Sequence, residues 1–248
     1  MLRIKNLTAR YDSAPVLTDL SLEAGPGQVI GIIGRNGAGK TTTFRCILNQ
    51  MPQRDGSIRF NDVDLTRVAP NRIPSLGIAF VPQGRGTFEE LTVGENLSLV
   101  RVPKQEARAR LDAATKKFPL LLERWNQPAG TLSGGEARMV SLARAMMLAP
   151  KLVLLDEPTV NLSESRLATL TGLVGEWRSR GAAILMIEHN LDFLFATADR
   201  VYVIDRGEVA FQGLAEDLRR NGKAELKKLF GLDQPQSQSK LVSSTYEN

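Results

Sequence analysis

The chain has 248 residues, 42% of them hydrophobic, so it can bury a substantial core in one large α/β domain or two small ones. Its formal net charge of +5 allows attraction to phosphates, nucleic acid or an anionic membrane surface without discriminating among them. A lone cysteine, Cys46, excludes an internal disulfide and is expected to be a small buried apolar group. No apolar run reaches the roughly 20 residues needed to span a bilayer, and the N-terminus does not resemble a secretion signal. Composition therefore predicts a globular, cytoplasmic protein.

The first elements in the chain are predicted in the order strand, loop, helix. Alternating residues predict a strand over 2–11, and an apolar run predicts another over 28–34. A helix over 40–51 follows directly after the segment GRNGAGKT. Further strands are expected at 57–60, 77–82, 152–156, 182–188, 201–205 and 208–212, the last two joined by a tight turn at Arg206-Gly207.

Between residues 84 and 148 the strand pattern stops. Helices are predicted instead over 92–100, 104–118 and 134–148. The apolar run LVLLD indicates a strand buried on both faces, as in a parallel sheet covered by helices. The sequence thus predicts an α/β core with a helical insertion, followed at 233–248 by a polar, solvated tail.

Residues 34–41 form a complete phosphate-loop pattern, in which Gly34 is followed after four residues by Gly39-Lys40-Thr41. Glycines let successive backbone N–H groups point at phosphate oxygens, and the helix that follows adds its positive end. Lys40 is expected to contact the β- and γ-phosphates, and Thr41 to hold Mg²⁺. A dinucleotide-binding loop is the natural alternative, but the spacing of its glycines differs from that found here.

Two further segments indicate phosphate chemistry. In LVLLDEPT an apolar strand ends in Asp156, expected to order the Mg²⁺ shell, and Glu157, expected to act as general base on the attacking water. In TLSGGEARM, Ser133 and Glu136 form a capping box at a helix start. The intervening Gly134-Gly135 lowers helix propensity by about 1 kcal/mol per residue, which indicates that bare backbone is needed to admit an anion.

Together, GRNGAGKT, LSGGE at 132–136 and LVLLDEPT resemble the motifs of the ABC ATPase family, over roughly residues 1–232. The resemblance implies an α/β P-loop NTPase fold in one domain, 1–232, with a mostly parallel core sheet, an antiparallel β subdomain and a helical subdomain at about 84–148. It also implies that two such domains pair head to tail, so that the LSGGE signature of one closes over the γ-phosphate held by the other.

The resemblance implies the remaining site residues. Tyr11 resembles the aromatic residue that stacks on adenine, with Val16 beside it, and Gln83 and His189 join Glu157 as the catalytic set. Thr41, Gln83 and Asp156 are expected at Mg²⁺. The full set expected at ATP is Tyr11, Val16, Gly34, Arg35, Asn36, Gly37, Ala38, Gly39, Lys40, Thr41, Thr42, Ser133, Gly134, Gly135 and Glu136.

Glu136, where many relatives have Gln, and the segments 77–85 and 85–97 resemble importer subunits for branched-chain amino acids and urea. The segment 158–165 departs from the family pattern at Asn161, which leaves the detail of cross-dimer contacts open. The predicted function is an ATPase subunit that energises a membrane transporter from the cytoplasmic face of the membrane. Its expected partners are a second ATP-binding subunit, membrane permease subunits and, indirectly, an extracytoplasmic solute-binding protein.

Alternative functions are a transporter subunit for another cargo, such as lipid, and a soluble ABC ATPase acting on DNA or ribosomes. The absence of sustained heptads between Lys40 and Leu132, and the presence of one nucleotide domain, favour the transporter, so no nucleic-acid partner is expected. The segment 84–91 is expected to dock the membrane partner. Phe88 is either the exposed anchor of that surface or part of the core of the helical insertion.

Overall fold

The computed structural model describes residues 1–12 and 14–221, so the tail expected at 233–248 lies outside the described residues. The strands are β1 (Leu2–Tyr11), β2 (Ala14–Ala24), β3 (Val29–Ile33), β4 (Arg54–Phe60), β5 (Val63–Asp64), β6 (Ile78–Val81), β7 (Leu152–Asp156), β8 (Ala183–Ile187), β9 (Arg200–Asp205) and β10 (Glu208–Leu214). The α-helices are α1 (Lys40–Ile47), α2 (Val93–Ser98), α3 (Lys104–Lys117), α4 (Leu120–Glu123), α5 (Gly134–Met147), α6 (Glu164–Ser179), α7 (Leu191–Thr197) and α8 (Ala215–Asn221).

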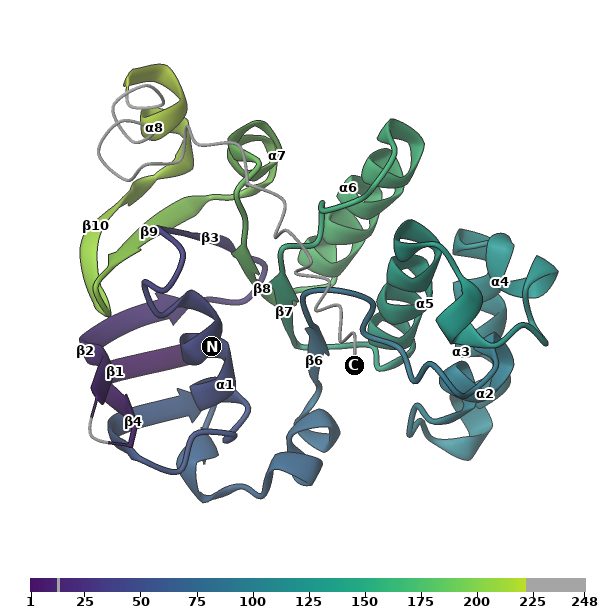
Figure 1. Ribbon diagram of the computed structural model, residues 1–248, viewed down its shortest axis with the longest axis horizontal. Coiled ribbons are helices and arrows are strands. Elements are labelled where there is room, and N and C mark those ends of the chain that lie inside the picture. The colour runs from purple at the N-terminus through teal and green to yellow at the C-terminus, as the bar shows by residue number, and fades with distance from the viewer. Residues whose placement is uncertain (13, 222–248) are drawn as a thin grey trace, which may run out of the picture.

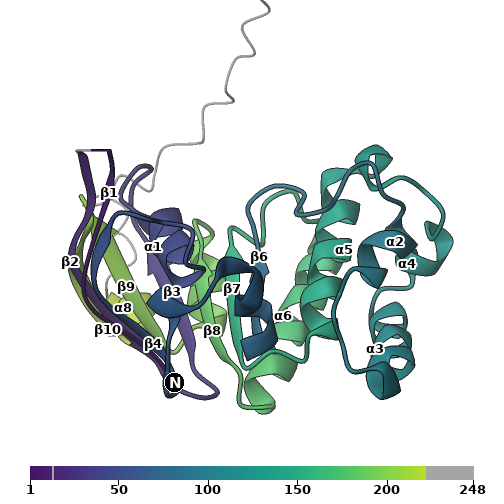
Figure 2. The same ribbon diagram turned by 90° about the horizontal axis from the view of Figure 1, so that it is seen from below.

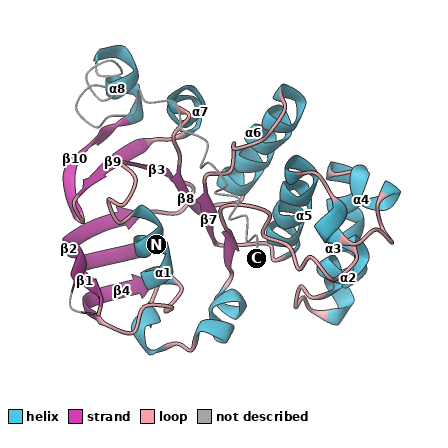
Figure 3. Cartoon of the chain, viewed as in Figure 1, coloured by secondary structure: helices cyan, strands magenta, loops and turns pink. Residues whose placement is uncertain are grey.

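The predicted parallel core sheet is confirmed. Its strand order is β10-β9-β3-β8-β7-β6, and every neighbouring pair from β9 to β6 is parallel, while β10 runs antiparallel at one edge (Figure 3). Strands β3, β7 and β8 are buried at every position. Their carboxyl ends lie at one edge of the sheet, which is where open parallel sheets bind ligands.

Alternation along the parallel strands divides the interior into two hydrophobic cores. In β7, Val153 and Leu155 pack with the helical part of the molecule. Leu152 and Leu154 point to the other face, where they join α1 and the antiparallel sheet. Because each face of the sheet is covered, the strands read as continuous apolar runs in the sequence.

The second sheet is antiparallel, in the order β2-β1-β4-β5. Strand β2 was not predicted from the sequence. Its register slips between Leu17 and Leu20, where Asp19 has a φ of +50°, so the alternation of apolar residues is interrupted within the strand. This bulge hides the period of two on which a strand prediction depends.

The chain between β6 and β7 carries the predicted helices, α2, α3 and α5, and also the short α4. Figure 2 shows these helices gathered at one end of the molecule, away from the antiparallel sheet. Helix α6 was not predicted, although Leu170, Leu173, Val174 and Trp177 repeat on one buried face. Among the described residues, no helix has the length and apolar content required to cross a membrane.

Two smaller predictions are confirmed. Arg206 and Gly207 have φ values of +48° and +85°, as a two-residue hairpin turn between β9 and β10 requires. Cys46 is buried in α1, and burial raises the pKa of its thiol to about 11, so the thiol is neutral and packs as an apolar group.

Candidate functional site

The phosphate loop, residues 34–41, joins the carboxyl end of β3 to the start of α1. Gly34 has a φ of +153°, and a Cβ there would lie 2.1 Å from the carbonyl oxygen of Ile204. Gly39 has a φ of +105°, and a Cβ there would lie 2.5 Å from a methyl group of Leu17. Glycine is therefore required at both positions, and the loop follows a path that a side chain would block.

Lys40 begins α1, and its ammonium group turns back over the phosphate loop. Nζ donates hydrogen bonds to the carbonyl oxygens of Gly34, at 2.8 Å, and Arg35, at 3.0 Å. Burial lowers the pKa of Lys40, whereas the negative charges of Glu157 and Asp156 oppose that shift. The cation is thus held between the loop and two carboxyl groups, where interactions with phosphate are strengthened by the low local dielectric.

Asp156 ends β7 and faces the same loop. Its Oδ2 accepts a hydrogen bond from the Thr41 hydroxyl at 3.2 Å, whereas its buried Oδ1 has no hydrogen-bond partner among the described residues. Burial is the main cause of the raised pKa of Asp156. A divalent cation beside Oδ1 would supply the missing partner, and a carboxylate with a hydroxyl is a ligand set that suits Mg²⁺.

The described residues contain no cluster of three or more His, Cys, Asp or Glu side chains that could hold a metal ion by themselves. Mg²⁺ commonly binds through one or two protein groups and takes its other ligands from phosphate and water. Thr41 and Asp156 fit such a site. Gln83, the third residue expected at Mg²⁺, instead contacts Glu157.

Glu157 is the centre of the predicted catalytic set. Its Oε2 accepts a hydrogen bond from Gln83 Nε2 at 2.8 Å, and its Oε1 lies 3.1 Å from His189 Nε2. These three residues follow the neighbouring strands β7, β6 and β8 respectively. Glu157 has a φ of +48°, a conformation that costs about 1–3 kcal/mol for a residue other than glycine and is typical of functional sites.

The adjacent carboxyl groups of Asp156 and Glu157 have pKa values shifted in opposite directions. The hydrogen bond from His189 is the largest cause of the lowered pKa of Glu157, and the bond from Gln83 and the charge of Lys40 act in the same direction. Glu157 is therefore ionised at neutral pH and is a competent proton acceptor. Neighbouring carboxyl groups with separated pKa values are typical of sites in which each has a distinct task.

Glu188 is a functional candidate that was not predicted from the sequence. The residue is 1% exposed, and its carboxylate accepts hydrogen bonds from the backbone N–H groups of Thr159 at 2.9 Å, His189 at 2.9 Å and Asn190 at 3.0 Å. Glu188 thereby joins the segment after β7 to the segment after β8. Glu157 and His189 belong to the same two segments. The signal in the sequence is an acidic residue directly after a buried strand, as at Glu157.

The capping box predicted at the start of α5 is confirmed. Ser133 Oγ accepts from the Glu136 N–H at 3.3 Å, and the Glu136 carboxylate accepts from the Ser133 N–H at 2.8 Å. Ser133 and Gly134 are exposed, whereas a Cβ at Gly135 would lie 3.0 Å from the backbone carbonyl oxygen of Asn161 and 2.4 Å from the movable end of the Arg166 side chain. The first glycine therefore leaves backbone open to an anion, while the second is closely packed against the segment that contains Asn161 and Arg166.

The signature, residues 132–136, lies far from the phosphate loop in the fold. Figures 1 and 2 both show α5 and α1 on opposite sides of strands β6 and β7. In the described part of the chain, no hydrogen bond or ion pair joins the signature to residues 34–42. The two surfaces of the chain that are expected to bind phosphate thus do not meet.

The residues expected at the adenine base and along the phosphate loop lie around α1. The hydroxyl of Tyr11 accepts a hydrogen bond from Arg45 of α1 at 2.7 Å, and the residue is 41% exposed, so Tyr11 is accessible for stacking on adenine. A Cβ added at Gly39 would lie 3.0 Å from the carbonyl oxygen of Val16, so β2 packs against the loop. Of the others, Arg35, Asn36 and Gly37 are exposed, Ala38 and Thr42 are buried, and Thr41 is half-buried.

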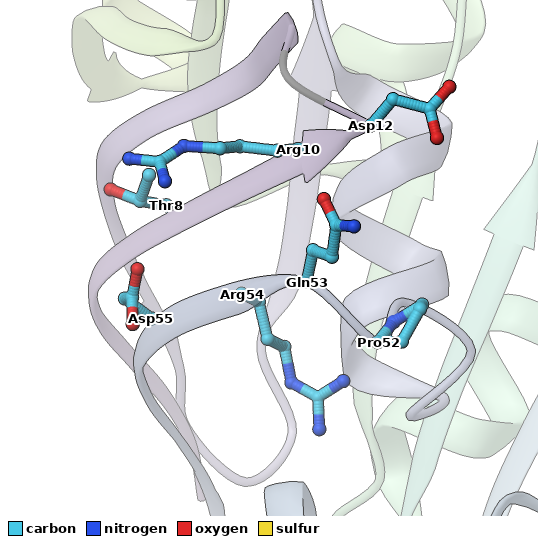
Figure 4. Close-up of a pocket in the computed structure, with 7 residues that line it drawn as sticks. All are labelled: Thr8, Arg10, Asp12, Pro52, Gln53, Arg54 and Asp55. Atoms are coloured by element: carbon cyan, nitrogen blue, oxygen red, sulfur yellow. The ribbon is translucent and has the colours of Figure 1, made fainter.

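A separate open hollow of about 490 Å³ lies where β1 approaches β4, and it contains none of the predicted site residues (Figure 4). Its lining is polar and includes Arg10, Asp12 and Arg54. Figure 4 shows the side chains of Arg10 and Asp12 pointing in opposite directions. Arg54 is already bound to Asn49 and the Met51 carbonyl, so the charges do not converge on one ligand position.

The sequence matches the family model described as ABC transporter over residues 17–160. That span contains the phosphate loop, Gln83, the signature and the pair Asp156-Glu157. The chain belongs to the ABC transporter family. The predicted ABC ATPase fold and ATPase activity are confirmed, and the chain is an ATP-binding subunit of this family. Such subunits work as dimers with membrane permease subunits.

Curated relatives match most of the chain. The high-affinity branched-chain amino acid transport ATP-binding protein BraG of Pseudomonas aeruginosa is 34% identical, covering 90% of this chain and 97% of its own length. The lipopolysaccharide export system ATP-binding protein LptB of Escherichia coli is 31% identical, and the match covers 88% of this chain and 92% of LptB. Among solved structures, an ATP binding subunit of an ABC transporter has a TM-score of 0.82 at 28% identity, covering 94% of this chain and 100% of that one.

Proposed function

We propose that the chain is the ATP-hydrolysing subunit of a membrane importer for branched-chain amino acids, urea or a similar small solute. The observation that carries the hydrolytic part of the proposal is the contact of Glu157 with both Gln83 and His189, because it equips a nucleotide site for hydrolysis. The similarity to BraG supports the role in import. The subunit works on the cytoplasmic face of the membrane, bound to permease subunits. An extracytoplasmic solute-binding protein delivers the solute to them.

In the proposed reaction the phosphate loop and Lys40 hold the ATP phosphates. Glu157 accepts a proton from the water that attacks the γ-phosphorus, the bond from that phosphorus to the bridging oxygen breaks, and ADP and phosphate leave. Gln83 and His189 hold Glu157 and the water in place. Mg²⁺, when bound beside Thr41 and Asp156, supplies positive charge that offsets the charge on the phosphates. The exposed start of α5 binds the γ-phosphate held by the partner, so two chains form two complete sites.

The cargo is tested with subunits that copurify from native membranes. After reconstitution into vesicles, ATP-driven uptake of leucine or urea is the expected result. The similarity to LptB favours a second candidate function, in which the cargo is a lipid. Extraction of lipopolysaccharide from the vesicles, with no uptake of small solutes, would support that second function and contradict the first.

Asp156→Asn should weaken the Mg²⁺ dependence of the site, because it keeps the shape of the side chain but removes its charge. We expect the Mg²⁺ concentration for half-maximal ATP hydrolysis to rise by roughly 10- to 100-fold. Equilibrium binding of ATP without Mg²⁺ should not weaken, since the phosphate loop is intact. An unchanged Mg²⁺ titration would show that Asp156 does not serve the metal.

Phe88 is expected to anchor the permease, and its position is that of a surface residue. The side chain is 51% exposed, and the guanidinium of Arg144 lies 5.0 Å from the centre of its ring. The buried side chain of Asn96 holds the Phe88 backbone, accepting from its N–H at 2.9 Å and donating to its carbonyl oxygen at 3.0 Å. An aromatic side chain on a fixed backbone is typical of interface anchors.

Phe88→Asp should abolish copurification with the membrane subunits while ATP hydrolysis by the free subunit remains within about twofold, since an exposed substitution has little effect on stability. Leu122→Asp is the matched control, because Leu122 is 62% exposed on α4 in the same helical segment. Pull-down from membranes that contain either variant measures the effect. Equal retention of the permease by both variants would rule out Phe88 as the anchor.

A further inference from the structure

Arg138 lies on α5, five residues after Ser133, and is a buried cation to which the proposed reaction gives no task. Its side chain is 2% exposed. Nη1 donates to the carbonyl oxygen of Pro82 at 2.5 Å, and Nη2 donates to the carbonyl oxygen of Glu157 at 3.4 Å. Nε has no hydrogen-bond partner within the described chain. Arg138 thus connects α5 to the segment that contains Gln83 and to Glu157.

The charge of Arg138 is costly where it lies. Burial lowers its pKa, and only the negative charges of Asp156, Glu188 and Glu157 oppose that shift. Within residues 1–12 and 14–221, no carboxylate lies within ion-pair distance of the guanidinium. An apolar side chain of similar volume would avoid the desolvation cost, so the buried charge indicates a role in the site rather than in stability.

Two further arginines join the same loop to α5, Arg144 from the last turn of the helix and Arg85 from the loop itself. Arg144 donates to the carbonyl oxygen of Gly86 at 3.0 Å. From the loop side, Arg85 donates to the carbonyl oxygen of Leu132 at 2.9 Å, directly before the signature. The loop that contains Gln83 is therefore fixed to the signature helix along its length, and Arg138 alone of these three also reaches Glu157.

We propose that Arg138 is a positioning residue that holds Gln83 and Glu157 at a fixed distance from the signature helix of the same chain. The proposal rests on the catalytic roles given to Gln83 and Glu157 in the proposed function. The signature serves the nucleotide of the partner, whereas Gln83 and Glu157 serve the chain's own nucleotide. Arg138 therefore transmits the position of α5 at one site of the dimer to the water-orienting groups of the other site.

Arg138→Met tests this role, since it keeps an unbranched side chain and removes the donors and the charge. We expect kcat for ATP to fall roughly 10-fold or more, because small misplacements of catalytic groups have large effects, while KM for ATP changes less than about twofold. Arg138→Lys, which keeps the charge and one donor toward Pro82, should recover part of kcat. Arg110→Met is the matched control, because Arg110 of α3 donates to the Met147 carbonyl at the far end of α5 and should leave kcat unchanged.

A mixed dimer distinguishes an effect of Arg138 on the nucleotide of its own chain from an effect on the nucleotide of the partner. One chain carries Lys40→Ala and the other Ser133→Arg, so the single intact site combines the phosphate loop of the second chain with the signature of the first. Arg138→Met added to the chain with the intact phosphate loop should reduce hydrolysis roughly 10-fold. The same substitution added to the chain that provides the signature should leave hydrolysis within about twofold.

Unchanged kcat in Arg138→Met would overturn the proposal, and so would an effect that follows the chain providing the signature. If both Arg138 variants lose activity only in proportion to lost folded protein, measured by thermal unfolding, Arg138 is merely structural and the proposal is wrong. Glu157→Gln is assayed in parallel. Normal hydrolysis by Glu157→Gln would refute the proposed function itself, whereas an inactive Glu157→Gln beside a normal Arg138→Met would refute only the role of Arg138.

Discussion

Glu157→Gln should lower the turnover number for ATP by a factor of about 10² or more while ATP binding is preserved. The amide has nearly the shape of the carboxylate and retains an oxygen that can accept from Gln83. It has no basic oxygen to take a proton from water. A factor of 10² corresponds to about 2.7 kcal/mol of activation free energy, which is within the range expected for loss of a general base.

Three measurements are needed for this prediction. Single-turnover hydrolysis gives the chemical step, equilibrium binding gives the affinity for ATP, and size-exclusion chromatography with ATP should show a more persistent dimer. Glu208→Gln, which removes a carboxylate charge from the exposed strand β10, is the control for a change of net charge and should hydrolyse ATP normally. Near-normal turnover by Glu157→Gln would move the role of base to another group.

The parts of the site that the sequence predicts are those encoded by local spacing. The phosphate loop depends on Gly34, Gly39 and Lys40 within one strand-to-helix connection, so eight residues specify its path. The capping box at Ser133 and Glu136 is local in the same sense, and both of its hydrogen bonds are present. The parallel strands are predicted from local runs of apolar residues, because each strand is buried on both faces.

The parts that were missed depend on contacts between distant segments. Strand β2 is concealed by the bulge at Asp19, which is visible only when its partner β1 is aligned beside it. Glu188 becomes significant because it accepts the N–H of Thr159, 29 positions away in the chain. Arg138 is an ordinary helix residue in the sequence. Its burial and its bonds to Pro82 and Glu157 follow from tertiary packing that no local pattern specifies.

Mixing Lys40→Ala with Ser133→Arg should restore ATP hydrolysis to roughly a quarter of the wild-type level, although each variant alone should lose a factor of about 10² or more. Random exchange makes half of the dimers mixed. Each mixed dimer has one doubly damaged site and one intact site, because the Ser133→Arg chain supplies a good phosphate loop and the Lys40→Ala chain a good signature.

The physical reason is the separation, within one chain, of the two surfaces that are expected to bind phosphate. Figure 1 places α1 and α5 on opposite sides of β6 and β7, while Ser133 and Gly134 remain exposed at the start of α5. A helix end in open solvent attracts an anion by only about 0.3–1 kcal/mol. Closure against the partner's phosphate loop would exclude water and strengthen that attraction.

Because Ser133 caps α5, Ser133→Arg removes a cap worth about 0.5–2 kcal/mol in addition to blocking the phosphate. Ser133→Asp separates these effects, since aspartate is a good N-cap but its charge repels the γ-phosphate. It should complement Lys40→Ala as Ser133→Arg does. Crosslinking in the same mixture measures the fraction of mixed dimers, and hydrolysis is compared with that fraction. If mixed dimers are abundant and neither serine variant restores hydrolysis, the two sites are strongly coupled or the signature acts on its own chain's phosphate, and the shared-site arrangement is contradicted in its simple form.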